Sequence, residues 1–576
     1  MPFERRPFHI LRFFCYAFTL IPIVFTLAGC SSSAPANADK TQPVKQGAMV
    51  KISTSGKRLV RYQQPDFLTY DELVSISNNP AVEGSLKKKI ERFWKSPVIS
   101  NEAYYSGKRP YHQSVDALGE TLRVASWNIE KSLTMPQVAQ ALTSAEAYDA
   151  MIHSIKAPQG STLRSEMKRQ RDRLASADVI FLQEMDIGIS RSDYIDAARL
   201  LAKALGMNYA YAPQALEIDP VLLGLEAPIN PAYSRKKSDQ TSPQIAGAKI
   251  ATVDKAKYKG VFGSAILSRY PILNVEVFQL KTQPYDWYKG EIKPGDMVEE
   301  GRRLGSAWVF ENVITRELKI GGRNFFRVDI AVPQVPGGVV SLINNHLEIK
   351  TLPKGREMQM QEILDHVKKI PHPVIMAGDH NSAPNDVSAT SIHRVIWRMV
   401  DNPAAFVATA SNVSGLLTGT MIPLYRERGV LNILKNFQDP LAPNVPILFP
   451  NSVLGLFNRV KDFRFDDGSS FDFRGDEERS INGRTGLLAN SNEKHLKGQS
   501  TTFSMNRPIG PIGRYRLDWF FVKSGHLKSA LDTNGSYRFA PHFGETLGKF
   551  NDGLASPLSD HRPIVIDLPF HEPKLK

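Results

Sequence analysis

Seven short apolar runs recur along the chain between residues 122 and 568. They are rich in Val, Ile, Leu and Phe, and runs of this kind are typical of buried β-strands. The runs are LRVASW, DVIFLQ, GSAILS, VVSLINNH, PVIMAG, RLDWFFV and RPIVIDL. Apolar residues also recur three or four positions apart over 194–205 and 360–367, which predicts amphipathic helices, the first capped by Ser192 or Asp193. Strands mixed with helices indicate an α/β fold.

Other parts of the chain show neither period. Residues 214–258, 281–300 and about 400–500 are rich in Pro, Gly, Asn and charged residues, and we interpret the last as a large insertion with a short helix near 430–437. Residues 58–120 mix short helical and loop signals. We interpret them as an N-terminal extension ahead of a domain that spans 121–570.

The first thirty residues have the pattern of a targeting segment. Arg5 and Arg6 precede an apolar stretch that ends in Leu-Ala-Gly-Cys, which predicts a secretory signal peptide over residues 1–29. The sequence LAGC resembles the bacterial lipobox, and this implies cleavage before Cys30 and lipid attachment to it. An uncleaved anchor helix is less favoured, because the apolar run is short for a bilayer. A twin-arginine signal is a further alternative.

Residues 30–57 are rich in Ser, Ala, Pro, Lys and Gln, which indicates a flexible tether. Ser31 follows Cys30, and by the usual sorting pattern of bacterial lipoproteins this favours the outer membrane. We therefore predict a cell-envelope lipoprotein that is held to the membrane through its lipid anchor. The sequence does not indicate an oligomeric state.

Composition and charge narrow the class of protein. The chain has 576 residues, 42% of them apolar, so it can bury a large core. The composition excludes disordered, collagen-like and membrane-bundle proteins. The two cysteines, Cys15 and Cys30, both lie in the first thirty residues, which rules out a disulfide framework. The formal net charge of +14 favours anionic partners such as nucleic acid or phospholipid, although 72 basic against 58 acidic residues do not by themselves make a patch.

Polar residues stand at the ends of six of the apolar runs. They are Asn128, Glu130, Gln183, Glu184, Asp186, Asn345, His346, Glu348, Asp379, Asn381, Asp518, Asp560 and His561. Taken alone, each is more often a turn or surface residue than part of a site. Asp518 is harder to explain in this way, because a carboxylate between Leu517 and Trp519 is costly to bury without a partner. Strand ends that converge would bring the whole set into one site.

These motifs, in this order, resemble those of the endonuclease/exonuclease/phosphatase superfamily, which includes DNase I-like nucleases, neutral sphingomyelinases and inositol phosphatases. The matching stretches are SWNIE, FLQEMD, SAILSRYP, NNHLE, GDHN, RLDW and SDHRP. Each is weak alone, but the ordered set is specific. The resemblance implies a DNase I-like, four-layer α/β/β/α sandwich of two mixed sheets, with the active site at one end of the sandwich.

Hydrolysis of a phosphate ester needs positive charge beside the phosphoryl oxygens, a water that loses a proton and a stabilised leaving group. Glu184 is the best metal ligand for Mg²⁺, with Mn²⁺ as an alternative, because both ions prefer hard oxygen donors. The resemblance implies that Asn128 and Asp560 complete or support that metal site. The role of Glu130 stays open.

The remaining motif residues suit proton transfer and phosphate binding. His561 is the natural general base because histidine titrates near neutral pH, and Asp518 would orient its ring. Asp379 and Asn381 would orient the attacking water, and His346 would donate a hydrogen bond or proton to the phosphate. Whether Asp379 or His561 takes the proton is left open by the sequence.

Two positions depart from the usual pattern of the family. His380 stands where relatives usually carry an apolar residue, and Ser264 stands where many carry Asn. Arg302 and Arg303 are phosphate contacts by resemblance, and a solvated turn is an equal alternative for them.

The sequence therefore predicts a Mg²⁺-dependent phosphodiesterase. Its substrate would be nucleic acid, a phospholipid head group or a small phosphate ester, and the fold alone does not choose among them. The alternative is a catalytically inactive envelope lipoprotein that binds phosphorylated ligands. A purely structural lipoprotein would make the ordered motifs a coincidence.

Overall fold

The computed structural model describes seven stretches of the chain, all within the unit Thr41–Lys576. They are residues 45–49, 59–225, 253–292, 317–383, 453–495, 498–509 and 512–574. The predicted signal peptide, Cys30, most of the tether, Arg302, Arg303 and the predicted helix near 430–437 lie outside these residues. Within them, the structure has no helix with the length and apolar character that crossing a membrane requires.

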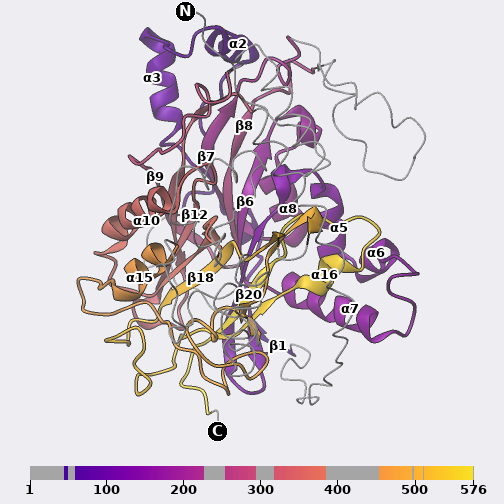
Figure 1. Cartoon of the computed structure of the whole chain (residues 1–576), viewed down its shortest axis with the longest axis vertical. Helices are drawn as coiled ribbons and strands as arrows, with labels where there is room; N and C mark the ends of the chain where they lie inside the picture. Colours follow the sequence, from indigo (N-terminus) through magenta and orange to yellow (C-terminus); the bar gives the residue numbers. More distant parts are fainter. Residues whose placement is uncertain are drawn as a thin grey trace, which may run out of the picture. The chain divides into compact units, whose positions relative to one another are not determined.

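The larger sheet has eleven strands among the described residues, in the order β1-β4-β5-β6-β8-β7-β3-β2, with β10 beside β7, β20 beside β5 and β19 beside β20. Figure 1 labels β1, β6, β7, β8 and β20 of this sheet. Its strands are β1 Lys45–Met49, β2 Tyr62–Gln63, β3 Val98–Ser100, β4 Tyr111–Val115, β5 Gly119–Asn128, β6 Val179–Ile187, β7 Asn208–Glu217, β8 Val261–Ser268, β10 Lys319–Gly321, β19 His542–Thr546 and β20 Ile564–Pro569. β5 and β6 are parallel, whereas β6 and β8 are antiparallel, so the sheet is mixed.

The smaller sheet has the order β18-β13-β12-β11-β9. Its strands are β9 Ile272–Gln279, β11 Asn324–Ala331, β12 Val339–His346, β13 Val374–Asp379 and β18 Asp518–Lys523. β12 and β13 are parallel and the other pairs are antiparallel, so this sheet is mixed as well. Two short hairpins complete the strands, β14 Lys494–His495 with β15 Gly498–Gln499, and β16 Phe503–Ile509 with β17 Ile512–Tyr515.

The two sheets bury a shared apolar core. Leu122 and Val124 of β5 belong to the same cluster of buried side chains as Ile375 and Ala377 of β13. Side chains alternate between the two faces of a strand, so every second residue of each strand lies on this inner face. The same alternation carried to the strand ends places Asn128 and Asp379 on the inner face too.

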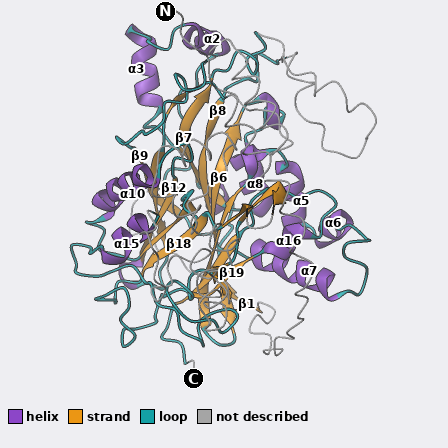
Figure 2. Ribbon diagram, viewed as in Figure 1, coloured by secondary structure: helices purple, strands orange, loops and turns teal. Residues whose placement is uncertain are grey.

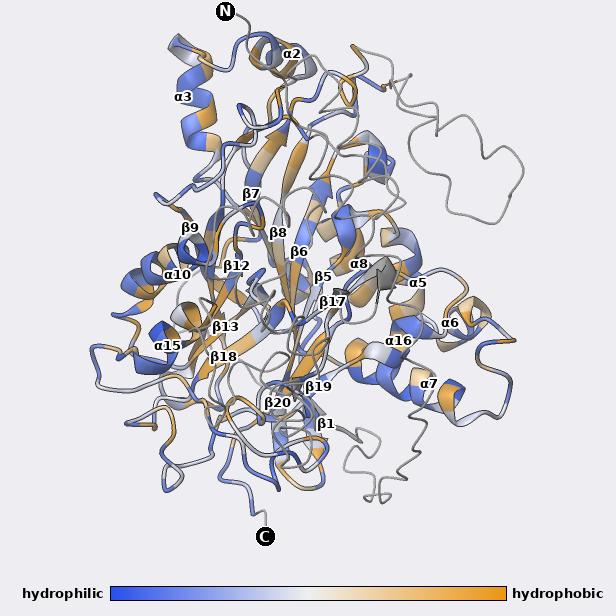
Figure 3. Cartoon of the chain, in the orientation of Figure 1, coloured by the Kyte–Doolittle hydropathy of each residue, from blue (hydrophilic) through white to orange (hydrophobic). Residues whose placement is uncertain are grey.

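Helices cover the outer face of each sheet. α10 Pro353–Val367 and α15 Leu454–Asp462 share a core with the smaller sheet. The helices that share a core with the larger sheet are α2 Tyr70–Asn78, α3 Gly84–Phe93, α5 Met135–Thr143, α6 Ala145–Met151, α7 Thr162–Ala175, α8 Ala197–Leu205 and α16 Gly548–Asp552. Figure 2 shows α10 and α15 on one side of the strands and α5, α6, α7, α8 and α16 on the other. Figure 3 shows that α7 and α10 carry both hydrophilic and hydrophobic residues. The predicted four-layer sandwich of two mixed sheets is confirmed.

Two local predictions differ from the structure. The helix predicted over 194–205 begins at Ala197, and its N-cap is Asp196, whose side chain accepts a hydrogen bond from the Arg199 amide over 3.0 Å. Ser192 ends the 3₁₀ turn η3 Ser190–Ser192 instead, and Asp193 has a left-handed backbone. The second helix begins at Pro353, because proline is well suited to the first helical turn.

Segments that we interpreted as additions contribute to the sandwich. Residues 59–120 supply β2, β3 and β4 to the larger sheet, together with the short helix α4 Glu102–Tyr105. Residues 453–495, part of the predicted insertion, supply Phe457, Phe471 and Phe473 to the core beneath α10 and α15. Strands of two to five residues are too short to show a clear alternation, and scattered phenylalanines show no period, so the sequence pattern could not reveal either contribution.

Candidate active site

The polar residues predicted from the strand ends meet at one edge of the sandwich. Asn128 and His346 end β5 and β12, and these strands are parallel to β6 and β13 respectively. In the antiparallel strands the starts lie at this edge, so Asp518 at the start of β18 is opposite Asp379 at the end of β13. β20 also starts here, and the loop before it carries Asp560 and His561.

A tight approach of β12 and β13 brings their two polar ends together. His346 and Asp379 are register partners in the parallel pair. Gly378 has φ +149°, and a Cβ atom at this position would lie 1.9 Å from the carbonyl oxygen of Asn345. Only glycine allows the backbones to approach so closely with this conformation. The glycine of the GDHN motif therefore lets β12 and β13 approach closely enough to place Asp379 beside His346.

Glu184 reaches the site through an irregularity in β6. Regular alternation would place it on the helix-covered face together with Leu182. Instead, the register of β6 against β8 shifts between Leu182 and Met185, and Glu184 has a left-handed backbone with φ +59°. Its Oε1 accepts a hydrogen bond from Asn128 Nδ2 over 3.2 Å. Bulges of this kind redirect a side chain next to a functional site.

A strained turn follows β5. Glu130, Lys131 and Ser132 all have left-handed backbones, with φ values of 46°, 53° and 59°. The Ser132 hydroxyl donates to the Glu184 carbonyl over 3.3 Å, which ties the turn to β6. Glu130 Oε2 accepts a hydrogen bond from the amide of Asp560 over 3.1 Å. Three consecutive residues in this conformation cost free energy, so the conformation persists only where surrounding contacts hold it.

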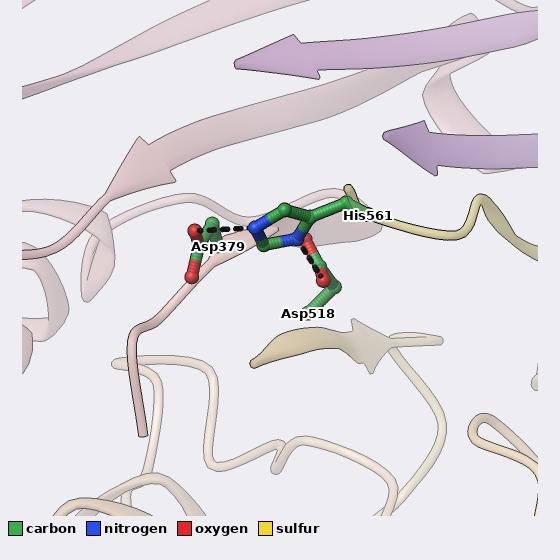
Figure 4. Close-up of side chains that lie close together, drawn as sticks. All are labelled: Asp379, Asp518 and His561. Atoms are coloured by element: carbon green, nitrogen blue, oxygen red, sulfur yellow. Dashed lines mark hydrogen bonds and ion pairs between the residues drawn. The ribbon is translucent and has the colours of Figure 1, made fainter. Parts of the chain in front are cut away.

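His561 and Asp518 form a buried hydrogen-bonded pair. His561 Nδ1 is 2.8 Å from Asp518 Oδ2, and the opposite ring atom, Nε2, is 3.8 Å from Asp379 Oδ2. Figure 4 shows the imidazole between the two carboxylates. Burial opposes the charged ring, but the carboxylate of Asp518, followed by that of Asp379, raises the pKa of His561 well above its ordinary value. The backbone of His561 is fixed by Trp127, whose Nε1 donates to its carbonyl over 3.0 Å.

Asp379 is the centre of the hydrogen-bond network. Its Oδ1 accepts from the Asn381 amide over 2.8 Å, and its Oδ2 accepts from Asn128 Nδ2 over 3.1 Å. Burial and the charge of Asp518 raise the pKa of Asp379 to about 7. Asp379 therefore has the pKa of a proton acceptor near neutral pH, whereas the raised pKa of His561 favours the charged form of its ring. The general base stays unassigned between the two.

His346 and Asn381 complete the inner part of the site. His346 Nε2 is 3.6 Å from Asp379 Oδ2 and 4.0 Å from Glu184 Oε1. Burial and the nearby Arg323 hold the pKa of His346 well below its ordinary value, so the ring is neutral. Asn381 Nδ2 donates to the Leu347 carbonyl over 3.0 Å, whereas its buried Oδ1 has no hydrogen-bond partner among the described residues. That oxygen can accept a hydrogen bond from a water or ligand.

The outer part of the site is rich in carboxylates and fits a divalent cation. Burial and the charge of Asp560 raise the pKa of Glu130 to about 8. Burial, opposed by His561 and reinforced by Glu184, raises the pKa of Asp560 to about 6. Crowded carboxylates with raised pKa values lack compensating positive charge, which a bound cation would supply. The oxygen donors of Glu184 and Asp560, with Asn128 holding Glu184 in place, are of the type that Mg²⁺ and Mn²⁺ prefer.

A second group of side chains has the spacing of metal ligands. One donor atom from each of Asp379, Asp518 and His561 lies within 4.8 Å of the others, and all three residues are buried. The 2.8 Å hydrogen bond between His561 and Asp518 favours a different role for these residues, that of a base and the carboxylate that orients it.

Some polar strand-end residues do not join the cluster. Asp186 pairs with buried Arg191 over 2.8 Å, and Glu348 pairs with Arg323 over 3.2 Å. These ion pairs support the strand ends from outside. Arg302 and Arg303 lie outside the described residues, so their predicted phosphate contacts stay predictions.

His380 lies on the other side of β13 from the reacting groups. It is fully buried against Phe521, with ring centroids 5.4 Å apart, and neither ring nitrogen has a hydrogen-bond partner among the described residues. Burial lowers the pKa of His380 to about 3. This position suits the apolar residue that relatives usually carry, and the histidine has no visible part in the chemistry.

Replacing His380 with leucine should make the protein more resistant to acid. In the unfolded chain a histidine titrates near pH 6.5, so below that pH the unfolded state binds a proton that folded His380 does not. Between pH 7 and pH 5 the free energy of unfolding of the wild type should therefore fall by about 2 kcal/mol more than that of His380→Leu. Urea unfolding at both pH values measures this difference. As a control, replacement of the exposed His526 with leucine should leave the fall in the free energy of unfolding as in the wild type. An equal fall in His380→Leu and the wild type between pH 7 and pH 5 would contradict the prediction.

Lys131 is a functional candidate that the sequence analysis did not single out. Its Nζ forms an ion pair with Glu317, which lies two residues before β10. Burial opposes its charge, but the carboxylate of Glu317 and the more distant one of Glu184 raise its pKa, so Lys131 is a cation at neutral pH. The one sequence signal for a role in the site was its position three residues after Asn128. That signal is weak, because a lysine in a turn is ordinarily a solvated residue.

Comparison with protein families agrees with this geometry. Residues 125–394 match the model of the Endonuclease/Exonuclease/phosphatase family. Over these residues the chain is similar to this family. Asn128, Glu184, His346, Asp379 and Asn381 lie within the match. The family's nucleases and phosphatases hydrolyse phosphate esters. Asp518, Asp560 and His561 follow the matched segment in sequence, and the structure brings them to the same strand ends.

The solved structures to which this chain is similar are distant in sequence. An endonuclease/exonuclease/phosphatase from Beutenbergia cavernae is 15% identical, with 78% of this chain and 71% of that chain covered and a TM-score of 0.34. The 3' phosphatase NExo from Neisseria, bound to a product DNA hairpin, is 12% identical, with coverage of 78% and 99% and a TM-score of 0.32. D. rerio TDP2, complexed with a single-strand DNA product, is 14% identical, with coverage of 78% and 98% and a TM-score of 0.31. No curated protein matches the chain.

Proposed function

We propose that this chain is a Mg²⁺-dependent phosphodiesterase, with Mn²⁺ as an alternative cofactor, that acts on nucleic acid or on phospholipid head groups. One observation carries the proposal. The His561–Asp518 pair, Asp379 and the carboxylate of Glu184 meet in one buried network, linked through Asn128. A protein that only bound phosphate would have no use for a paired histidine and aspartate beside a metal carboxylate.

The residues suggest how the reaction proceeds. Asp379 and Asn381 orient a water molecule for attack on phosphorus, and His561 or Asp379 takes the proton that the water loses as the ester bond to the leaving oxygen breaks. Asp518 stabilises the ring of His561 in its charged form, and neutral His346 donates a hydrogen bond to a phosphoryl oxygen. A divalent cation held by Glu184 and Asp560 would neutralise charge on the phosphoryl oxygens.

Activity assays with a metal chelator test the proposal. The chain used should start at Ser31 and keep β1, because Lys45–Met49 pairs with β4 in the larger sheet. Plasmid DNA, RNA, sphingomyelin vesicles and a chromogenic phosphodiester cover the substrate classes. We expect turnover of at least one of them with Mg²⁺ and none with EDTA. A wild-type protein that binds phosphate but hydrolyses none of these substrates would favour the alternative, an inactive binding lipoprotein.

We also propose that the mature protein is an outer-membrane lipoprotein anchored at Cys30. The supporting feature is the LAGC sequence at the end of an apolar, positively charged leader. Expressed in a Gram-negative bacterium, the wild type should be found in the outer-membrane fraction, whereas Cys30→Ala should lose lipidation and no longer be anchored through that residue. Metabolic labelling with a palmitate analogue measures the lipid directly, and equal labelling of both proteins would contradict the proposal.

A further inference from the structure

Lys131 is held at the edge of the carboxylate cluster by a turn with little freedom. The residues on either side of it are both tied down, Glu130 by the Asp560 amide and Ser132 by the Glu184 carbonyl. The Glu184 carboxylate interacts electrostatically with Lys131. The strained left-handed backbone thus holds an ammonium group within electrostatic range of the predicted metal ligands Glu184 and Asp560.

Exposure to solvent shows from which side a substrate reaches the site. The side chains of Asp518 and Asp379 are 0% and 3% exposed, and that of His561 is 5% exposed. Exposure rises to 20% at Glu184 and 27% at Lys131. A phosphate ester that approaches the buried groups therefore passes Glu184 and Lys131 first.

The charge of Lys131 is only partly neutralised within the protein. Glu317 pairs with Lys131 through Oε1 and with Lys319 through Oε2, the latter over 2.8 Å. One carboxylate thus serves two ammonium groups, which leaves net positive charge in this trio. Lys319 is directed away from solvent, with its Nζ 3.9 Å from the centre of the Trp287 ring, whereas Lys131 keeps an exposed part. Lys131 is the member of the trio that a ligand can contact.

We propose that Lys131 binds a non-bridging oxygen of the substrate's phosphate group and that Glu317 positions it for this contact. The inference rests on the proposed function, because it assigns a further substrate contact to the same site. A phosphate anion near Glu184, Asp379 and Asp560 experiences strong repulsion, and a cation at the entrance offsets it before the reaction begins. A lysine ammonium is a compact charge with three donors, which suits a phosphate oxygen.

Binding of inorganic phosphate in the presence of Mg²⁺ tests this contact separately from hydrolysis. Isothermal titration calorimetry should show phosphate affinity that is about 10- to 100-fold weaker for Lys131→Met than for the wild type, the range expected for one charge-assisted hydrogen bond. Lys131→Arg should keep most of the affinity. The matched control is Lys168→Met, because Lys168 also pairs with a carboxylate, that of Asp149 over 2.7 Å, but on the outer helix α7. For a chromogenic diester, Lys131→Met should raise KM more than it lowers kcat.

The possible outcomes separate the two proposals. Phosphate affinity and KM of Lys131→Met equal to those of the wild type would overturn the assignment. If Lys131→Met does not fold, Lys131→Gln removes the charge, keeps a hydrogen-bond donor for Glu317 and leaves the Glu317–Lys319 pair intact, and it should show a similar loss of phosphate affinity. A wild type that binds phosphate through Lys131 without hydrolysing any ester would overturn the proposed hydrolysis alone. A wild type that hydrolyses an ester with Mg²⁺ but does not bind phosphate would overturn the assignment of Lys131 alone.

Discussion

Replacing His561 with glutamine is expected to lower the rate of phosphate ester hydrolysis about 100- to 10,000-fold, the contribution typical of a positioned acid–base group. The ring of His561 is the group that connects Asp518 to Asp379, through a 2.8 Å hydrogen bond on one side and a 3.8 Å approach on the other. Glutamine can keep one of these contacts, but it cannot carry a proton between them. Both kcat and kcat/KM should therefore fall, with KM little changed.

The measurement is the rate of hydrolysis of a chromogenic phosphodiester at saturating Mg²⁺, with thermal unfolding of each variant as the test of folding. Asp518→Asn should also lose most of the activity, because an amide cannot stabilise the charged imidazole. His542→Gln is a matched control, because His542 is also a buried histidine. It begins β19, and its Nδ1 lies 2.9 Å from the carbonyl of Ala540 in the loop before that strand. A folded His561→Gln variant that keeps activity within tenfold of the wild type would remove His561 from the proposed role.

Replacing Glu184 with glutamine is expected to weaken Mg²⁺ binding about 100-fold or more and to abolish metal-dependent activity at ordinary Mg²⁺ concentrations. Substitutions of groups that only support a metal ligand already cost 10- to 100-fold in metal affinity, and Glu184 is the predicted ligand itself. Glutamine keeps the size of the side chain and can still accept from Asn128, so the site should keep its shape. The substitution therefore removes the negative charge of Glu184 and leaves the size of the side chain unchanged.

Thermal unfolding with and without Mg²⁺ distinguishes loss of the metal from loss of the fold. Metal that binds only the folded state raises the unfolding temperature of the wild type, and this rise should disappear in Glu184→Gln. In EDTA the variant should be at least as stable as the wild type, because one of several crowded carboxylates is gone. Glu276→Gln, on the exposed face of β9, is the control and should keep the Mg²⁺-dependent rise. A normal Mg²⁺ response in Glu184→Gln would exclude Glu184 as a ligand.

Much of the sandwich could be predicted from local pattern. The apolar runs from LRVASW to RPIVIDL all form strands, because a strand buried on both faces needs a continuous apolar segment whatever its neighbours are. The residues of the candidate site could be named as well, since each follows or begins such a run. How the extension and the insertion pack could not be predicted, for the converse reason. Residues such as Tyr62 and Phe471 take their places through pairing and packing with distant elements, which local periodicity does not record.

The sequence by itself determined the kind of chemistry, because an ordered set of carboxylates, amides and histidines at strand ends is the donor set that hydrolysis of a phosphate ester requires. The tertiary structure decided how those groups act on one another. It placed Asp518 against His561, turned Glu184 inward through a bulge and paired Lys131 with Glu317. Strand order, register shifts and left-handed turns arise from contacts between segments that are tens to hundreds of residues apart. No local pattern contains those contacts, so the geometry of the site follows from the fold alone.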